Sequence, residues 1–168
     1  GAIEAWDVSA VTYMGRAFST FRNKAGDETA DEDNIQAKTF TADLSKWDTS
    51  KVTSLLGTFL EASNFTSDLS KWDTSEVTTL RWTFGYAKNF TSDLSKWETS
   101  KVTTLQSTFL DASSFDSDLS KWETSKVTTL ESTFYGASSF TSDISNWDSS
   151  RATNFFVQTF QDAKSSPC

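Results

Sequence analysis

Apolar and polar positions follow one order that repeats every 25 residues along most of the chain. A phenylalanine opens each copy and a tryptophan stands seven residues later. The phenylalanines are Phe40, Phe65, Phe90, Phe115 and Phe140, and the tryptophans are Trp47, Trp72, Trp97, Trp122 and Trp147. A single unit of this length cannot bury its own apolar face, so the period predicts a solenoid of stacked coils with a continuous core.

Within each copy, one run of apolar residues has three- and four-residue spacing. In the first copy these are Val52, Leu55, Leu56, Phe59 and Ala62. This spacing is typical of one face of a short helix. Ser50 precedes the run and could cap the free backbone N–H groups of such a helix.

The segment 44–49 predicts a short strand that stacks in parallel on its equivalents in neighbouring coils. Residues two apart in a strand share a face, so we place Trp47 and Thr49 inward and Lys46 and Asp48 outward. The opposite orientation would expose a ladder of tryptophans. Such a ladder is a platform for sugars, which leaves a carbohydrate-binding solenoid as one alternative.

Together the elements predict an α/β fold: a single curved leucine-rich-repeat-like solenoid of about six coils, each a short parallel strand plus a short helix. The curvature is expected because helices pack 8–10 Å apart whereas strands lie about 4.8 Å apart. The expected parts of this one domain (1–168) are a partial N-terminal coil (1–21), an acidic insertion (22–39), four regular coils (40–139), a capping coil (140–163) and a tail (164–168).

The composition argues against several classes of partner and several kinds of chemistry. The net charge of −8 disfavours nucleic acid as a partner. No apolar run is long enough to span a bilayer, so we expect no direct membrane insertion of this segment. Histidine is absent, and the single cysteine, Cys168, permits no internal disulfide. The chain begins with Gly1, which suggests a processed or excised piece. The oligomeric state stays open.

Charged residues recur in columns, one residue per coil. A lysine column is formed by Lys46, Lys71, Lys96 and Lys121, and an acidic column beside it by Asp48, Asp73, Glu98, Glu123 and Asp148. A mixed-charge surface of this kind keeps a sheet soluble, and it could also dock a protein partner. The first four members of each column are our candidate binding residues. Because every carboxylate recurs, none forms a singular acid–base pair, and we predict no enzyme, no cofactor and no metal centre.

Two further columns leave alternatives open. Asp43, Asp68, Asp93, Asp118 and Asp143 precede the predicted strands. We expect each to accept backbone N–H bonds in its turn, with calcium between successive aspartates as the alternative. Threonines also align, as Thr41, Thr66, Thr91 and Thr141, and as Thr53, Thr78, Thr103, Thr128 and Thr153. A regular threonine array is one way to order water, so an ice-binding protein is the main alternative function.

The pattern Phe-x-x-Asp-Leu-Ser-x-Trp-Asp-x-Ser-x-Val-Thr-x-Leu-x-x-x-Phe-x-x-Ala resembles the repeat of BspA-like bacterial surface proteins, which include Mycoplasma and Listeria surface proteins. The likeness runs from Trp6 to about Ala163. It departs where the family's Trp-Asp-Val-Ser persists only at Val8 and where threonine replaces the methionine of Met-Phe, as at Thr83. The resemblance implies a leucine-rich-repeat-like fold, a cell-surface or secreted location, and adhesion or protein binding.

The sequence therefore predicts a non-catalytic surface or secreted repeat module. We expect its partner to be a protein or cell-surface ligand held on the outward face of the sheet. The acidic insertion, with Asp27, Glu28, Asp31, Glu32 and Asp33, is a second expected contact.

Overall fold

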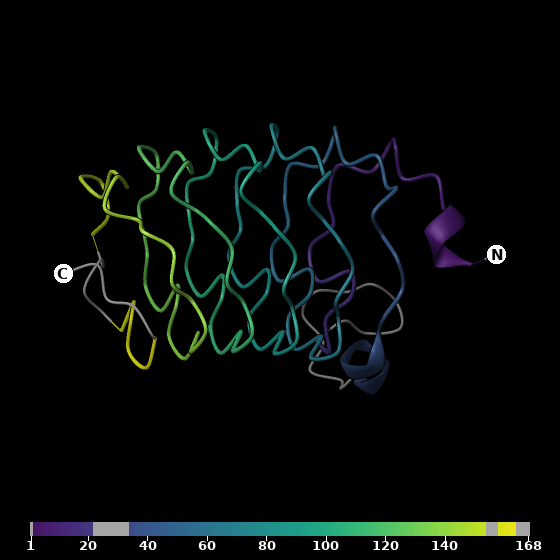
Figure 1. The fold of residues 1–168 in the computed structure, drawn as a ribbon. Coiled ribbons are helices and arrows are strands. Elements are labelled where there is room, and N and C mark those ends of the chain that lie inside the picture. The colour runs from purple at the N-terminus through teal and green to yellow at the C-terminus, as the bar shows by residue number, and fades with distance from the viewer. Residues whose placement is uncertain (1, 22–33, 154–157, 164–168) are drawn as a thin grey trace.

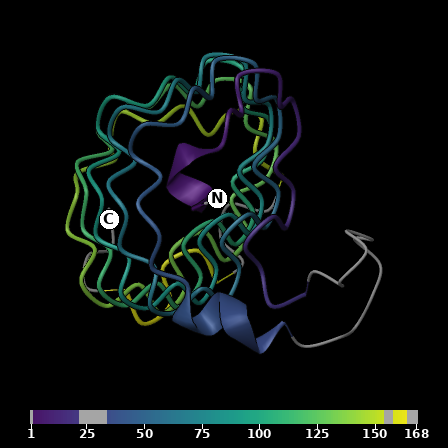
Figure 2. The same cartoon turned by 90° about the vertical axis from the view of Figure 1, so that its right-hand side faces the viewer.

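The computed structural model describes residues 2–21, 34–153 and 158–163, and it shows the chain winding through a row of stacked coils (Figure 1). Each coil lies beside the next one in sequence, and the first and last described residues lie at opposite ends of the row. Viewed along the row, successive coils superimpose on a common closed outline (Figure 2). The 25-residue period of the sequence is thus the length of one coil.

The core consists of columns of identical side chains that run the length of the stack. The repeated tryptophans are 3–9% exposed, and consecutive indoles are parallel to within 2° with centroids 6.1–6.5 Å apart. Two phenylalanine columns flank them. Phe59, Phe84, Phe109 and Phe134 are spaced by 5.6–5.7 Å, and Phe65, Phe90, Phe115 and Phe140 by 5.9–6.1 Å. Apolar burial between coils therefore stabilises the fold. Locally adjacent rings such as Phe84 and Phe90, with centroids 4.1 Å apart, add to it.

The predicted fold class is wrong. Within the described ranges the only helices are two 3₁₀ segments, η1 (Ile3–Ala5) and η2 (Ile35–Thr39), and extended pairing is limited to isolated parallel bridges at four residue pairs. The described parts of the coils therefore contain neither a sheet nor the expected helix. The expected curvature rested on the different widths of helices and strands, so it loses its basis as well.

The segment that resembled a helix is a run of consecutive turns. Thr58, Leu60 and Ala62 donate their N–H groups to the carbonyls three residues earlier, at 3.0–3.1 Å. Gly57 and Glu61 have positive φ angles of 56° and 60°, which a right-handed helix excludes. Three-residue turns place apolar side chains at the same spacing as a helix, so the sequence pattern alone does not distinguish the two.

The remaining N–H groups of this run bond to the next coil. Leu55, Gly57, Phe59 and Glu61 donate to the carbonyls of Thr79, Arg81, Thr83 and Gly85, at 2.7–3.2 Å, and later coils repeat the arrangement. Alternate N–H groups thus close turns within the coil or join adjacent coils. This division satisfies the backbone without a regular strand.

The predicted strand 44–49 is also replaced by turns, although its inside–outside assignment is confirmed. The N–H of Trp47 donates to the carbonyl of Leu44 at 3.1 Å, which closes a turn. Trp47 and Thr49 are buried, whereas Lys46 and Asp48 are exposed. The repeated tryptophans are therefore core residues and provide no exposed ladder for sugars.

Buried polar atoms add bonds between coils. The indole N–H of Trp72 donates to the carbonyl of Leu44 at 3.0 Å, and the equivalent bond recurs in the next three coils. The hydroxyl of Thr83 donates to the carbonyl of Leu55 at 2.9 Å. No buried side-chain nitrogen or oxygen of the described residues lacks a partner. The hydroxyl of the inward Thr49 instead donates to the carbonyl of Asp73 in the following coil, at 3.0 Å. The inward threonines are thus structural, because their hydroxyls join neighbouring coils.

The N-terminal end of the stack is covered by η1, which lies across the coil outline in Figure 2. Ile3 packs against the core, and its carbonyl accepts the indole N–H of Trp47 at 3.3 Å. Ile3 therefore replaces the leucine of the previous coil, whose carbonyl accepts the indole N–H of each later tryptophan. The acidic residues of the insertion and the tail 164–168 lie outside the described residues.

Candidate binding surfaces

The turn aspartates accept backbone N–H bonds, as expected. Asp43, Asp68, Asp93, Asp118 and Asp143 each accept the N–H of the serine two residues later, at 2.8–2.9 Å. The N–H and hydroxyl of Ser70 hold the pKa of Asp68 below its ordinary value, and the other four behave alike. Among the described residues, no three acidic or thiol side chains cluster in a way that could hold a metal ion.

The candidate lysines form an uninterrupted exposed column on the outside of the turn 44–47 and its equivalents. Lys46, Lys71, Lys96 and Lys121 are all exposed, and none makes an ion pair with a described residue. Each lysine lowers the pKa of the aspartate three residues earlier, as Lys71 does for Asp68, so it lies near that column. The ammonium groups therefore border carboxylates that turn bonds already use.

The candidate acidic residues lie in the next column and are also exposed. Asp48 and Asp73 accept the N–H groups of Ser50 and Ser75 at 2.9–3.0 Å. The longer side chains of Glu98 and Glu123 make no bond to the described residues. A fourth column follows, in which Lys101 and Glu76 form an ion pair at 2.7 Å. The structure thus arranges the candidate residues as parallel stripes of alternating charge.

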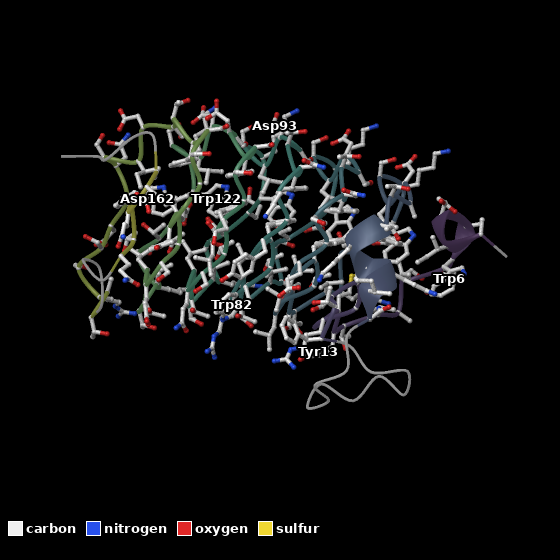
Figure 3. All side chains as sticks on the ribbon, turned by 90° about the horizontal axis from the view of Figure 1, so that it is seen from below. Trp6, Tyr13, Trp82, Asp93, Trp122 and Asp162 are labelled. Carbon is white, nitrogen blue, oxygen red and sulfur yellow. The ribbon has the colours of Figure 1, made fainter. Side chains whose placement is uncertain are left out.

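A different edge of the stack carries features that sequence reasoning missed. Figure 3 shows Trp82 on this edge and Asp93 on the opposite one, with Trp122 in the interior. The rings of Trp82 and Tyr86 are nearly parallel, at 19°, with centroids 6.3 Å apart, and both are half-buried. Both line a hollow of about 370 Å³, which is also lined by Leu56 and Gly57. The available signal was that copies differ at these positions while the rest of the unit is nearly constant.

No described helix is long and apolar enough to cross a membrane. No curated protein and no solved structure matches the chain. A family model described as "Mycoplasma protein of unknown function, DUF285" matches residues 1–70 and 68–167. Two successive matches of one model agree with the stacked copies of one unit, and together they cover nearly the whole chain. The chain is therefore a repeat protein that belongs to the DUF285 family.

Proposed function

We propose that the chain is a non-catalytic binding module that holds a protein or cell-surface ligand on its outward charged columns. The observation that carries this proposal is the lysine column of four consecutive coils. Its ammonium groups are exposed and have no ion-pair partner among the described residues, whereas the adjacent aspartates are held in turn bonds. Ordered charges of one sign favour a partner with the opposite charge at a matching spacing.

The BspA-like resemblance of the repeat supports a finer version of this proposal. In it, the module is part of a surface or secreted adhesion protein, and the partner is an acidic protein segment. The carboxylates of Asp48, Asp73, Glu98 and Glu123 flank the lysine column and would reject partners of the wrong charge register. They would contribute to specificity more than to affinity.

Replacing Lys71, Lys96 and Lys121 with glutamate is expected to abolish capture of the partner from the native surface or medium. The substitutions reverse three exposed charges, so circular dichroism should be unchanged. Capture by the unchanged protein should also weaken as salt rises, because exposed charges are screened over about 8 Å at physiological ionic strength.

The chain offers a matched control for that experiment. The variant Lys51→Glu/Lys101→Glu/Lys126→Glu alters the net charge by the same amount on another exposed column. It also breaks the ion pair between Lys101 and Glu76, which should cost only about 0–1 kcal/mol. This variant should retain capture. Equal loss in both triple variants, or retention in the first, would refute the assignment to the lysine column.

Ice binding is the second candidate function, and the threonine column beginning at Thr53 favours it. Thr53, Thr78, Thr103, Thr128 and Thr153 are exposed without interruption. The hydroxyls of the first four donate to a carbonyl of the previous coil at 3.0–3.1 Å, which fixes their orientation. The other column contains Asp116, whose carboxylate accepts the hydroxyl of Thr141 at 2.8 Å.

Ice binding predicts thermal hysteresis that depends on the first threonine column alone. Thr78→Lys/Thr103→Lys should remove the hysteresis, because the charged side chains interrupt the ordered array. Thr66→Lys/Thr91→Lys, on the interrupted column, should leave it unchanged. Absence of hysteresis and of ice-crystal shaping in the unchanged protein would exclude this second function.

A further inference from the structure

Differences between the copies concentrate on the edge of the stack that carries Trp82. At four positions in the run of consecutive turns, the coils carry different side chains, although their backbones are equivalent. These residues are Leu56, Gly57, Leu60 and Glu61; Arg81, Trp82, Gly85 and Tyr86; Gln106, Ser107, Leu110 and Asp111; and Glu131, Ser132, Tyr135 and Gly136. The core is therefore repeated, whereas this edge presents a different set of side chains in each coil. Such a non-repeating surface suits the recognition of an asymmetric ligand.

Trp82 and Tyr86 form a ridge on this edge. Both rings line the hollow on the side of the preceding coil, and both also line a second hollow, of about 450 Å³, on the side of the following coils. The neighbours of Trp82 in its column are Gly57 and Ser107, which are too small to cover an indole. Both sides of the aromatic pair are therefore accessible.

The first hollow combines apolar walls with two opposite charges. Leu56 and Leu60 line it together with Arg16 and Glu61. One carboxylate oxygen of Glu61, Oε2, accepts the hydroxyl of Thr20 at 3.1 Å and lies 3.7 Å from Nζ of Lys38. The other oxygen, Oε1, has no partner among the described residues. It is thus an acceptor beside the aromatic ridge.

The second hollow is polar. Gln106, Ser107, Asp111, Glu131 and Tyr135 line it, and the amide of Gln106 donates to the carboxylate of Glu131 at 3.0 Å. Burial and then the charges of Asp111 and Glu61 raise the pKa of Tyr86, so its phenol remains a hydrogen-bond donor at neutral pH. Both donors and acceptors therefore line the hollows beside the ridge, which suits hydroxyl groups, because these both donate and accept.

We propose that this ridge binds a neutral oligosaccharide, with one pyranose ring in each hollow. The C–H face of a pyranose is apolar and packs on an aromatic ring, while its hydroxyls bond to the polar groups at the rim. Glu61 lines the first hollow, and Asp111 and Glu131 line the second. Their carboxylates would repel an anionic ligand, which favours a neutral oligosaccharide over an acidic one. This site is separate from the lysine column, so the two proposals stand or fall independently.

The test is isothermal titration of the full chain with uncharged tetrasaccharides of glucose, mannose, xylose and N-acetylglucosamine, and with the corresponding monosaccharides. At least one tetrasaccharide should bind, and more tightly than its monosaccharide, because two hollows are filled. Trp82→Ala should weaken this binding about tenfold or more, because the aromatic contact is lost. Trp6→Ala should not change it, because Trp6 is an exposed tryptophan elsewhere, with 57% of its surface accessible.

A second variant tests the hollow without removing a ring. Gly57→Gln places a neutral side chain beside Trp82, and the backbone should accept it because Arg16, Trp82, Ser107 and Ser132 have the same positive φ, 53–59°. It should weaken binding by a similar factor and lower the melting temperature only slightly, because a side chain at the positive φ of Gly57 is strained but the same φ is adopted by its equivalents. The proposal is overturned if no tetrasaccharide binds at about 10 mM, if both variants bind normally, or if only an anionic oligosaccharide or a leucine-rich peptide binds.

Discussion

Replacing Trp97 with alanine is expected to lower the free energy of unfolding by about 3–5 kcal/mol, the cost of deleting a large aromatic side chain from a core. Trp97 is 4% exposed and stacks between Trp72 and Trp122, with centroids 6.5 and 6.4 Å away. Its indole N–H donates to the carbonyl of Leu69 at 3.0 Å. The substitution therefore removes apolar contact with two coils and one bond between coils.

Urea denaturation followed by circular dichroism measures this effect. Because each coil is stabilised by its neighbours, damage in the middle of the stack should weaken the coils on both sides. Trp97→Phe should cost less than the alanine variant, since a ring remains but the indole N–H is lost. Trp6→Ala is the control and should change the free energy of unfolding by at most about 0.5 kcal/mol, as is usual for an exposed residue. A loss below about 1 kcal/mol for Trp97→Ala would contradict the stacked core.

Acid is expected to destabilise the protein, with the melting temperature falling once the pH drops below about 4. Eight aspartates have pKa values lowered by hydrogen bonds from serines: Asp7, Asp43, Asp48, Asp68, Asp93, Asp118, Asp143 and Asp148. A carboxyl with a lower pKa in the folded state stabilises the protein above its unfolded pKa. That stabilisation is lost as the pH falls through the folded pKa, so eight similar sites should give a steep transition.

The acid effect can be assigned to the turns with a matched pair of variants. Asp68→Asn/Asp93→Asn keeps an oxygen that can accept the serine N–H but removes the titration. Its melting temperature should therefore fall less between pH 5 and pH 2 than that of the unchanged protein. Glu98→Gln/Glu123→Gln makes the same charge change at exposed residues without turn bonds, and its acid profile should match the unchanged protein. Identical profiles for all three proteins would exclude the turn carboxylates as the cause.

In the run 52–62, the spacing of apolar residues predicted which side chains are buried but not the backbone conformation. The spacing of Val52, Leu55 and Phe59 established which side chains face the core, and all three are buried. It could not distinguish a helix from consecutive turns, because both place inward residues three or four apart. The deciding contacts are bonds from one coil to the next, such as Gly57 N–H to the carbonyl of Arg81, which join residues far apart in sequence.

For the candidate binding surfaces as well, the sequence predicted which residues are exposed but not which residues lie close together. The alternation around Trp47 predicted correctly that Lys46 and Asp48 are exposed. The sequence did not reveal that Lys46 lies near Asp43, or that Trp82 and Tyr86 form a ridge between two hollows. These relations depend on the path of the turns and on how far each coil is displaced from the next.

By itself, the sequence determined that this protein is a stack of equivalent coils, because a 25-residue unit with one apolar face can bury that face only against another copy. It also determined the inward columns and the turn aspartates. Only the tertiary structure decided that the coils contain turns instead of strands and helices, since backbone N–H groups select partners in the next coil that no local pattern encodes. It alone brought Trp82, Tyr86 and the side chains of adjacent coils together on one edge.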